Sequence, residues 1–313
     1  MPLRMSRPPT VDLTTRLGSV VLDNPVMTAS GTAGHGHELA GHLDPSLLGA
    51  VVVKSLHAEP WEGNPAPRVH ATPSGMINSV GLQGPGVEAW LEHDYPPLAA
   101  TGAQVVASIW GRTVEEFARA AALLADAPSG VVAVEVNASC PNLEDRRALF
   151  AHSASATTEV VEASAAAGRP RWAKLSPNTP DLPDVAAAAA AAGAEAVTVA
   201  NTVLGMVIDV EARRPLLGAQ RGGLSGPAVR PVAVRAVFDV HEALRDVPII
   251  GVGGVTSADD ALEFLMAGAS AVQVGTATFA DPRAPARVLR DLGRWCDRRG
   301  VSRIDELIGV AHG

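Results

Sequence analysis

The sequence is short of cysteine, of aromatic side chains and of long apolar runs. Only two cysteines, Cys140 and Cys296, occur among 313 residues, which excludes the disulfide framework of a small secreted fold. Phe, Trp and Tyr make up 4% of the chain, so Ala, Val, Leu and Ile must fill the core. No apolar run reaches the roughly 20 residues of a membrane span, and the first ten residues lack the apolar core of a signal peptide. We therefore expect a cytoplasmic protein with reduced thiols and no membrane association.

Positive charge is also scarce. The chain has 25 Lys and Arg against 33 Asp and Glu, a net charge of -8. A protein that binds nucleic acid needs a basic face to neutralise phosphates, so we expect no nucleic-acid partner. The histidines show no H-E-x-x-H or other ligand spacing, and neither cysteine lies in a C-x-x-C pair. The pattern predicts neither a metal site nor an iron–sulfur cluster in this chain.

What the sequence does contain is a series of short, almost continuous apolar runs. Such runs are typical of strands that are buried on both faces of a parallel sheet. We predict eight strands: Pro25–Ser30, Ala50–Lys54, Gln104–Ile109, Val131–Asn137, Arg171–Ser176, Ala196–Ala200, Pro248–Gly251 and Ala271–Gly275.

Helical stretches separate most of these strands. Thr113–Ala125 opens with Thr113 and Glu116 at capping-box spacing, and Ser257–Ala267 begins with acidic residues in its first turn. Asp181–Ala192 has an Asp cap, an early proline and a glycine stop. Regular alternation of strand and helix predicts an α/β fold with a parallel sheet, and eight strands predict a closed (β/α)8 TIM barrel.

The remaining segments complete the predicted architecture. Val11–Leu22 is expected to form an N-terminal β-hairpin that turns at Leu17–Ser19 and covers the barrel floor. The long loop after strand 2, Ser55–Trp90, exceeds an ordinary connection and is expected to carry function. Residues 1–10, rich in proline, are predicted to be a disordered tip, and residues 11–313 a single barrel domain.

Polar residues gather where these strands end. Active sites of α/β barrels lie at the carboxyl ends of the strands, so these side chains are expected to share one site. They are Ser30 with Gly31, Lys54 with Ser55, Asn137 to Asn142, Lys174 with Ser176, and Asn201 with Thr202.

Glycines follow the last two predicted strands. Gly253 and Gly254 come after the seventh, and Gly275 with Thr276 after the eighth. Glycines there let backbone N–H groups approach an anion, and barrels commonly bind phosphate at this place. The pattern favours a phosphorylated cofactor, although the segment GVGGV is not the G-x-G-x-x-G of a Rossmann dinucleotide site.

The two cysteines differ in their surroundings. Cys296 lies within the apparent last helix and is expected to be a small buried side chain. Cys140 lies just past a strand, between Ser139 and Pro141, in a predicted loop. Such a position fits a thiol that acts as a base or a nucleophile.

A long series of motifs resembles the class 1 dihydroorotate dehydrogenases, and among them most closely the NAD-linked 1B catalytic subunits. The resemblance extends from about Val11 to Ile304. Its pieces are NPVMTASGTAG (24–34), GNPAPRV (63–69), GMINSVGLQGPG (75–86), EVNASCPN (135–142), AKLSPN (173–178), ANTVLGM (200–206), GGLSGPAVRPVA (222–233), PIIGVGG (248–254) and GASAVQVGTA (268–277).

The resemblance implies an FMN-dependent oxidation of dihydroorotate to orotate, the redox step of pyrimidine biosynthesis. Cys140 would be the general base that removes the C5 proton while the C6 hydride moves to flavin N5, with Lys54 as the second catalytic residue. Lys174 would lie near the pyrimidine edge of the flavin and stabilise its anionic reduced form.

The other site residues implied by the resemblance fall into two sets. The substrate set is Lys54, Asn78, Ser79, Val80, Gly81, Leu82, Asn137, Asn142, Asn201 and Thr202. The cofactor set is Ser30, Gly31, Lys54, Ser55, Ser108, Asn137, Lys174, Ala200, Gly226, Gly253, Gly254, Gly275 and Thr276.

In the 1B subclass electrons leave through a separate subunit that carries FAD and an iron–sulfur cluster. The resemblance therefore implies such a partner, and an assembly that is either a homodimer of this chain or a heterotetramer with the partner. Three alternatives stay open. The loop Leu143–Ala156 departs from the Gly-Gly stretch usual in the family, which permits an FMN oxidoreductase acting on a related ring. A Schiff-base lyase would use Lys174 as its amine. A non-catalytic flavin- or phosphate-binding subunit is the third.

Overall fold

Eight parallel strands form the centre of the molecule. The computed structural model describes residues 10–35, 37–139 and 149–313. The sheet order is β3-β16-β15-β10-β9-β8-β7-β4, and a parallel bridge between Met27 and Ala50 joins the two outer strands into a barrel. The predicted (β/α)8 barrel and all eight of its strands are confirmed. The strands are β3 (Val26–Thr28), β4 (Val51–Val52), β7 (Val105–Ile109), β8 (Val131–Asn137), β9 (Arg171–Lys174), β10 (Ala196–Val199), β15 (Ile249–Val252) and β16 (Ala271–Val274).

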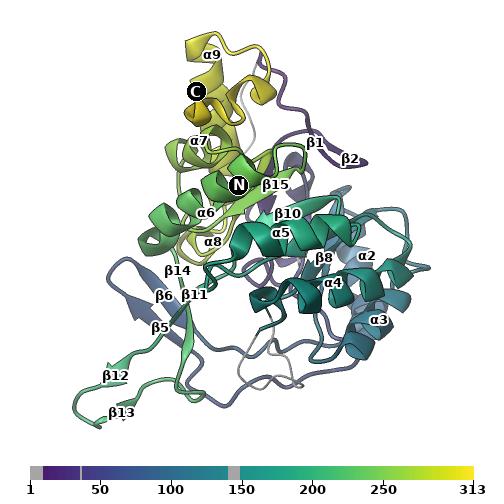
Figure 1. Ribbon diagram of the computed structural model, residues 1–313, viewed down its shortest axis with the longest axis vertical. Helices are drawn as coiled ribbons and strands as arrows, with labels where there is room; N and C mark the ends of the chain where they lie inside the picture. Colours follow the sequence, from purple (N-terminus) through teal and green to yellow (C-terminus); the bar gives the residue numbers. More distant parts are fainter. Residues whose placement is uncertain (1–9, 36, 140–148) are drawn as a thin grey trace.

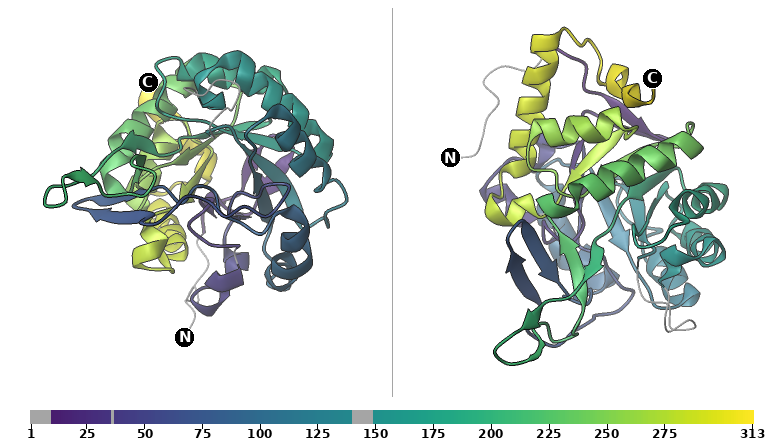
Figure 2. Two further views of the ribbon diagram at one scale, coloured as in Figure 1. Left: turned by 90° about the horizontal axis from the view of Figure 1, so that it is seen from below. Right: turned by 60° about the vertical axis from the view of Figure 1, so that its left-hand side comes forward.

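Helices cover the outside of this barrel (Figures 1 and 2). The longer ones are α3 (Val114–Ala122), α4 (Ala154–Ala163), α5 (Leu182–Ala191), α6 (Arg230–Ala243), α7 (Ala258–Met266) and α9 (Ala284–Arg299). Short helices are α1 (Val87–Ala89), α2 (Tyr95–Ala99) and α8 (Ala277–Ala280), with a π turn at Trp90–Asp94. Single 3₁₀ turns occur at His37–Gly41, Pro45–Leu47, Phe150–His152, Ser164–Ala167, Pro227–Val229, Ile304–Leu307 and Val310–His312.

The predicted helix starts hold to different degrees. Ser257 and Asp260 form a reciprocal capping box on α7, with bonds of 3.3 and 2.9 Å. Thr113 accepts a bond from the Glu116 amide at the start of α3, but the Glu116 carboxylate accepts from the Arg112 amide instead of closing a box. Asp181 precedes α5 at the expected place, yet its side chain makes no capping bond.

An N-terminal hairpin covers the floor of the barrel, as predicted. It consists of β1 (Thr15–Leu17) and β2 (Val20–Leu22), paired antiparallel around Gly18. Gly18 has a φ of +64°, a conformation that favours glycine in a tight turn. Leu17 and Leu22 are fully buried against side chains from the amino ends of the barrel strands, among them Met27, Ala133, Trp172 and Ile250.

Inside the barrel the side chains form layers. Every second residue of a strand points inward, so residues two apart on one strand belong to successive layers. On β9 the apolar Trp172 precedes Lys174, and on β8 Ala133 precedes Glu135, which precedes Asn137. The interior nearest the hairpin is apolar and consists of Met27, Ala50, Val52, Val106, Ala133, Trp172, Ala196, Ile250 and Ala271. The next layer is polar but fully or almost fully buried, and consists of Ser108, Glu135, Lys174, Thr198 and Gln273.

A second, antiparallel sheet lies at the opposite end of the barrel from the hairpin (Figures 1 and 2). Its order is β11-β14-β6-β5, built from segments far apart in the sequence. Two of its strands fall within the predicted loop Ser55–Trp90 and the other two have no predicted element, because all four are short, polar or rich in glycine and lack an apolar pattern. They are β5 (Val69–Thr72), β6 (Gly75–Asn78), β11 (Val203–Gly205) and β14 (Gly222–Ser225), with a protruding pair β12 (Ile208–Asp209) and β13 (Arg214–Pro215).

Cys296 belongs to the core, as predicted. It lies on α9 with no exposed surface, and burial raises the pKa of its thiol to about 11. At the other end of the chain, Thr10 hydrogen-bonds to the Asp297 carboxylate through its amide and its hydroxyl; the rest of the predicted disordered tip lies outside the described residues. None of the helices in the described ranges has the length and apolar character needed to cross a membrane.

Candidate active site

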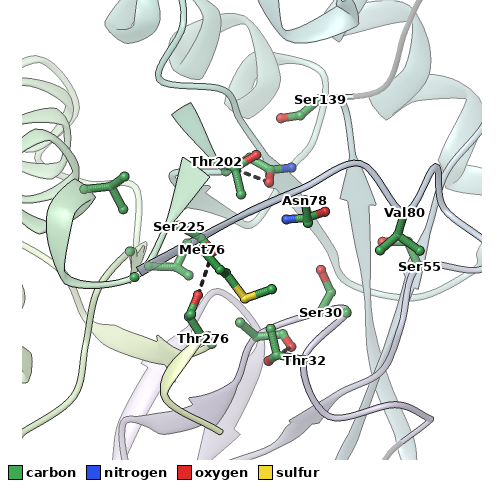
Figure 3. A pocket seen from close by; sticks show the side chains of 18 of the residues that line it. Ser30, Thr32, Ser55, Met76, Asn78, Val80, Ser139, Thr202, Ser225 and Thr276 are labelled. Atoms are coloured by element: carbon green, nitrogen blue, oxygen red, sulfur yellow. Dashed lines mark hydrogen bonds between the residues drawn. The ribbon is translucent and has the colours of Figure 1, made fainter. Parts of the chain in front are cut away.

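A cavity of about 320 Å³ lies between the carboxyl ends of the barrel strands and the second sheet. β6 and the residues after it form one wall, while the strand ends form the other. Figure 3 shows the side chains of Ser30, Asn78 and Thr202 around this space. The position agrees with the rule that α/β barrels carry their sites at the carboxyl ends of the strands.

Most of the residues predicted for the two binding sets line this one cavity. From the substrate set it includes Lys54, Asn78, Ser79, Val80, Gly81, Leu82, Asn137, Asn201 and Thr202. From the cofactor set it further includes Ser30, Gly31, Ser55, Lys174, Ala200, Gly226, Gly253, Gly254, Gly275 and Thr276. Cys140 and Asn142 lie outside the described residues, but the chain reaches the cavity at the adjoining Ser139.

Two of the described candidates do not line the cavity: the fully buried Ser176, just past β9, and Ser108. Ser108 is fully buried in the layer below, where its hydroxyl lies 2.9 Å from the Ser55 hydroxyl and 3.3 Å from the Glu135 carboxylate. Ser108 lies inside β7 rather than after it, one layer short of the strand end. Its contact is with Ser55, which itself faces the cavity.

Amide side chains at the strand ends are linked to each other. Asn137 donates to the Ser55 hydroxyl at 3.3 Å, and Asn201 donates to the Asn137 side-chain oxygen at 3.3 Å. Asn78 donates across the second sheet to the Gly223 carbonyl at 3.4 Å. These bonds fix the amide planes, so the site presents amide donors and acceptors in set directions.

The chain contains two lysines, Lys54 and Lys174, and both line the cavity. The Lys174 ammonium donates to the Ser30 hydroxyl at 3.1 Å and lies 3.7 Å from a Glu135 carboxylate oxygen. Lys174 is 4% exposed and Glu135 fully buried. A buried ion pair therefore lies at the base of the cavity, with Lys174 on its wall and Glu135 below.

A close approach of backbone to backbone shapes one end of the cavity. Gly226 and Gly254 have φ values of +96° and +75°, and a Cβ on Gly254 would lie 2.8 Å from the Gly226 carbonyl. A Cβ on Gly226 would likewise lie 2.7 Å from the Gly75 Cα, so these segments can approach only as glycines. Next to Gly226, Thr276 donates to the Ser225 hydroxyl at 2.8 Å, drawn as a dashed line in Figure 3. Exposed backbone amides beside glycines suit a phosphate group.

The long loop after β4 is held over the cavity by its own side chains. The Trp61 indole N–H donates to the Gly81 carbonyl at 3.0 Å, and Asn64 donates to the Ser79 carbonyl at 3.1 Å. Leu82 adopts a φ of +61°, in the left-handed region that is costly for a leucine. Eight residues of Ser55–Trp90 line the cavity, five of them in the run from Asn78 to Leu82, so the loop predicted to carry function lies at the candidate site.

A group of rings and charges ties this loop to α3. His57 lies 4.9 Å from the Trp110 ring, centroid to centroid, and its Nε2 lies 3.4 Å from the Glu116 carboxylate. Arg112 stacks on Trp61 and pairs with Glu116 at 2.7 Å. Partial burial alone would raise the pKa of Glu116, but the hydrogen bonds from Arg112 outweigh it and lower the pKa to about 2.

Several wall residues were missed from the sequence. Most are apolar or small and carry no chemical signature. Glu135, which lies below the wall, was also missed, although a carboxylate inside an otherwise apolar strand is rarely buried without a reason. Within the described ranges no group of three or more His, Cys, Asp or Glu could hold a metal ion. The missed wall residues are Ala29, Thr32, Val69, Met76, Ser225, Val229, Val252 and Phe279.

Comparisons with known proteins find one family throughout. The family model described as dihydroorotate dehydrogenase matches residues 12–295. Three relatives named dihydroorotate dehydrogenase B (NAD(+)), catalytic subunit, are similar to the chain. The Desulforudis audaxviator protein is 50% identical over 297 residues, 95% of this chain and 96% of that one. Those of Desulforamulus reducens and Pelobacter propionicus are each 46% identical, over 96% of this chain and 99% and 98% of theirs. The similarity thus extends from the N-terminal hairpin into α9.

Proposed function

Because the chain belongs to the dihydroorotate dehydrogenase family, we propose that it oxidises dihydroorotate to orotate in pyrimidine biosynthesis, with FMN as the bound hydride acceptor. The observation that carries the proposal is the gathering of both lysines and three asparagines, Asn78, Asn137 and Asn201, around one cavity. A dihydropyrimidine ring with a carboxylate offers alternating donors and acceptors and one negative charge, which this set matches.

The residues present fit FMN. Gly253 and Gly254, with Gly275 and Thr276, would hold its phosphate by backbone amides. A Cβ on Gly253 or Gly254 would lie 2.8 Å from Ala233 or from the Gly226 carbonyl, so this backbone course requires glycine. Lys174, buried and hydrogen-bonded to Ser30, would face the pyrimidine edge of the ring. FMN supplies a two-electron acceptor for the C6 hydride of the substrate.

On the substrate side the chain's own residues bind, orient and exchange one proton. Lys54 would neutralise the substrate carboxylate, and the linked amides of Asn137 and Asn201 would align the ring. We assign the removal of the C5 proton to the Cys140 thiolate, on the family resemblance. Loss of that proton and of the C6 hydride together makes the C5–C6 double bond of orotate, so the reaction balances.

The geometry of Lys174 argues against the Schiff-base alternative. An amine that attacks a carbonyl needs a free lone pair facing the substrate, whereas Lys174 donates to the Ser30 hydroxyl at 3.1 Å and is ion-paired with the fully buried Glu135 at 3.7 Å. No feature of the described site favours that reaction.

We also propose that electrons leave through a partner subunit carrying FAD and an iron–sulfur cluster. The similar proteins are each named a catalytic subunit with NAD(+), which implies a further subunit in those proteins. Two cysteines in the whole sequence are too few to supply four thiolate ligands to a cluster. With dihydroorotate as the donor, the purified chain alone is expected to reduce a soluble dye but not NAD+. Reduction of NAD+ by the chain alone would contradict the proposal that a partner subunit is required.

Anaerobic mixing with dihydroorotate tests the function. The purified protein should be yellow, and the flavin absorbance should bleach on mixing. Flavin that binds but stays oxidised would reject this substrate, and trials with related dihydropyrimidines would then test the related-ring alternative.

The two cysteines provide a matched pair for the proton transfer. Cys140→Ser should slow flavin reduction by about 100-fold or more, because general-base catalysis commonly contributes that much. Cys296→Ala, which changes a core residue of α9, should leave the rate within about twofold. Equal rates for Cys140→Ser and the wild-type protein would remove Cys140 from the mechanism.

A further inference from the structure

A buried carboxylate lies beneath the proposed flavin site, and it belongs to neither the predicted substrate-binding residues nor the predicted cofactor-binding residues. Glu135 is in the middle of β8 with no exposed surface. One of its oxygens accepts from the Gln273 amide at 2.7 Å and from the Thr198 hydroxyl at 3.2 Å, and the other accepts from Ser108 at 3.3 Å. Three neutral donors from three other strands therefore converge on one carboxyl group, so both of its oxygens are hydrogen-bonded although it is fully buried.

The charge facing this carboxylate is the Lys174 ammonium, at 3.7 Å. Lys174 lines the cavity while Glu135 does not, so the lysine lies between the carboxylate and the space above it. Among the described wall residues, Lys54 is the other charged group, and no charged residue of β7, β10 or β16 faces the pair.

The layer below shows that this position does not require a charge for packing. Trp172 and Ala133, two residues earlier on β9 and β8, fill the same interior with apolar atoms. A buried ion pair is rarely more stabilising than apolar packing, because both charges must leave water. The pair is therefore better explained by what it does to the cavity than by the stability of the barrel.

We propose that Glu135 is a positioning residue that keeps Lys174 charged and directed at the cavity, and thereby favours reduced over oxidised FMN. The inference rests on the proposed function, since it requires FMN above Lys174. A buried lysine without a counter-ion gives up its proton readily. Without Glu135, the buried Lys174 would lose its counter-ion, and the negative charge of reduced FMN would lose the support of a firmly held cation.

The first test is the midpoint potential of bound FMN at pH 8.5. Glu135→Gln keeps the shape of the side chain but removes its charge. It should weaken the preference for reduced FMN at least tenfold, which lowers the midpoint potential by about 30 mV for a two-electron couple. As the pH is lowered, the difference between the potential of Glu135→Gln and that of the wild-type protein at the same pH should shrink, because Lys174 regains its proton. Thr198→Val removes one hydrogen bond but no charge and should leave the potential near the wild-type value.

A double variant separates action through Lys174 from a direct effect of the Glu135 charge. Lys174→Met should lower the potential, and adding Glu135→Gln should lower it no further. Glu135→Asp, which keeps the charge, should retain part of the wild-type potential. An unchanged or raised potential in Glu135→Gln, or additive shifts in the double variant, would overturn the proposal.

The second test needs no flavin. Because the chain has only two lysines, 13Cε-lysine labelling gives two side-chain signals, which Lys174→Met assigns. In flavin-free Glu135→Gln the titration of the Lys174 signal should move down by about one pH unit or more, while that of Lys54 stays in place. An unmoved Lys174 signal would overturn the inference and leave the proposed function standing. Failure of dihydroorotate to bleach the wild-type flavin would instead reject the function, whatever this signal shows.

Discussion

At the amino ends of the barrel strands, Trp172 and Met27 pack without exposed surface against the β1–β2 hairpin. At the carboxyl ends the same strands present Lys174, Asn137 and other polar groups to a cavity. A floor that excludes water contributes hydrophobic free energy, whereas the cavity end holds charges and amides that cost free energy to bury. The comparison teaches that burial of apolar side chains at the amino end offsets the free-energy cost of the buried charges and amides at the carboxyl end.

The largest expected effect on stability is at the floor. Trp172→Ala should lower the free energy of unfolding by about 3–5 kcal/mol, because it empties a fully buried site. Urea denaturation measures this loss, and Trp172→Phe should recover much of it. Flavin reduction by the folded variant should be nearly normal; a large drop in its rate would show that the two ends are not separate.

The buried pair should come next. Lys174→Met leaves the Glu135 carboxylate without its cation, and we expect a loss of about 3 kcal/mol in unfolding free energy. The double variant Glu135→Gln/Lys174→Met should be more stable than Lys174→Met alone, because no unpaired charge remains. Denaturation of the flavin-free proteins provides the comparison. A double variant as unstable as the sum of its parts would mean that the two charges are not coupled.

A smaller, pH-dependent effect is expected at the outer wall of the cavity end. Glu116 has a pKa lowered to about 2 from an ordinary 4.5, so its bonds with Arg112 stabilise the fold above pH 4.5. That stabilisation should be lost as the pH falls from 4.5 towards 2. We expect about 1–2 kcal/mol, reduced for partial exposure. Glu116→Gln should flatten this part of a plot of unfolding free energy against pH, and an unchanged slope would refute the assignment.

The smallest effect is expected on the protruding ribbon between β12 and β13. Val210 is 75% exposed there, so Val210→Ser should change the unfolding free energy by less than about 0.5 kcal/mol. Thermal denaturation measures the difference. A clear loss would show that this ribbon is covered by protein in solution.

Much of the barrel could be predicted because its strands are apolar runs with helices between them. VVAVEVN and AVQVG stand out along the chain, and the hairpin has a glycine turn between apolar runs. The second sheet could not be predicted in this way. Its strand GGLS, in β14, is too short and too rich in glycine to show a period, and it forms because Gly223 pairs with Asn78 from a distant segment.

The residues of the candidate site also fall into those that the sequence could predict and those that it could not. Asn201, Lys54 and Gly254 could be named because each follows a predicted strand, and strand ends meet at one edge of a barrel. Ser108 and Glu135 could not be interpreted from the sequence, since their roles depend on which layer they occupy. Ser108 lies one layer below the cavity wall, where it contacts Glu135.

The sequence by itself determined the barrel, its hairpin floor and the kinds of side chain at its carboxyl end, because these follow from local apolar patterns and strand order. Only the tertiary structure decided that Glu135 lies 3.7 Å from Lys174 and that residues from β6 close over the cavity. The reason is physical: periodicity fixes which face of a strand is inward. Distances between inward groups depend on the stagger of the strands around the barrel.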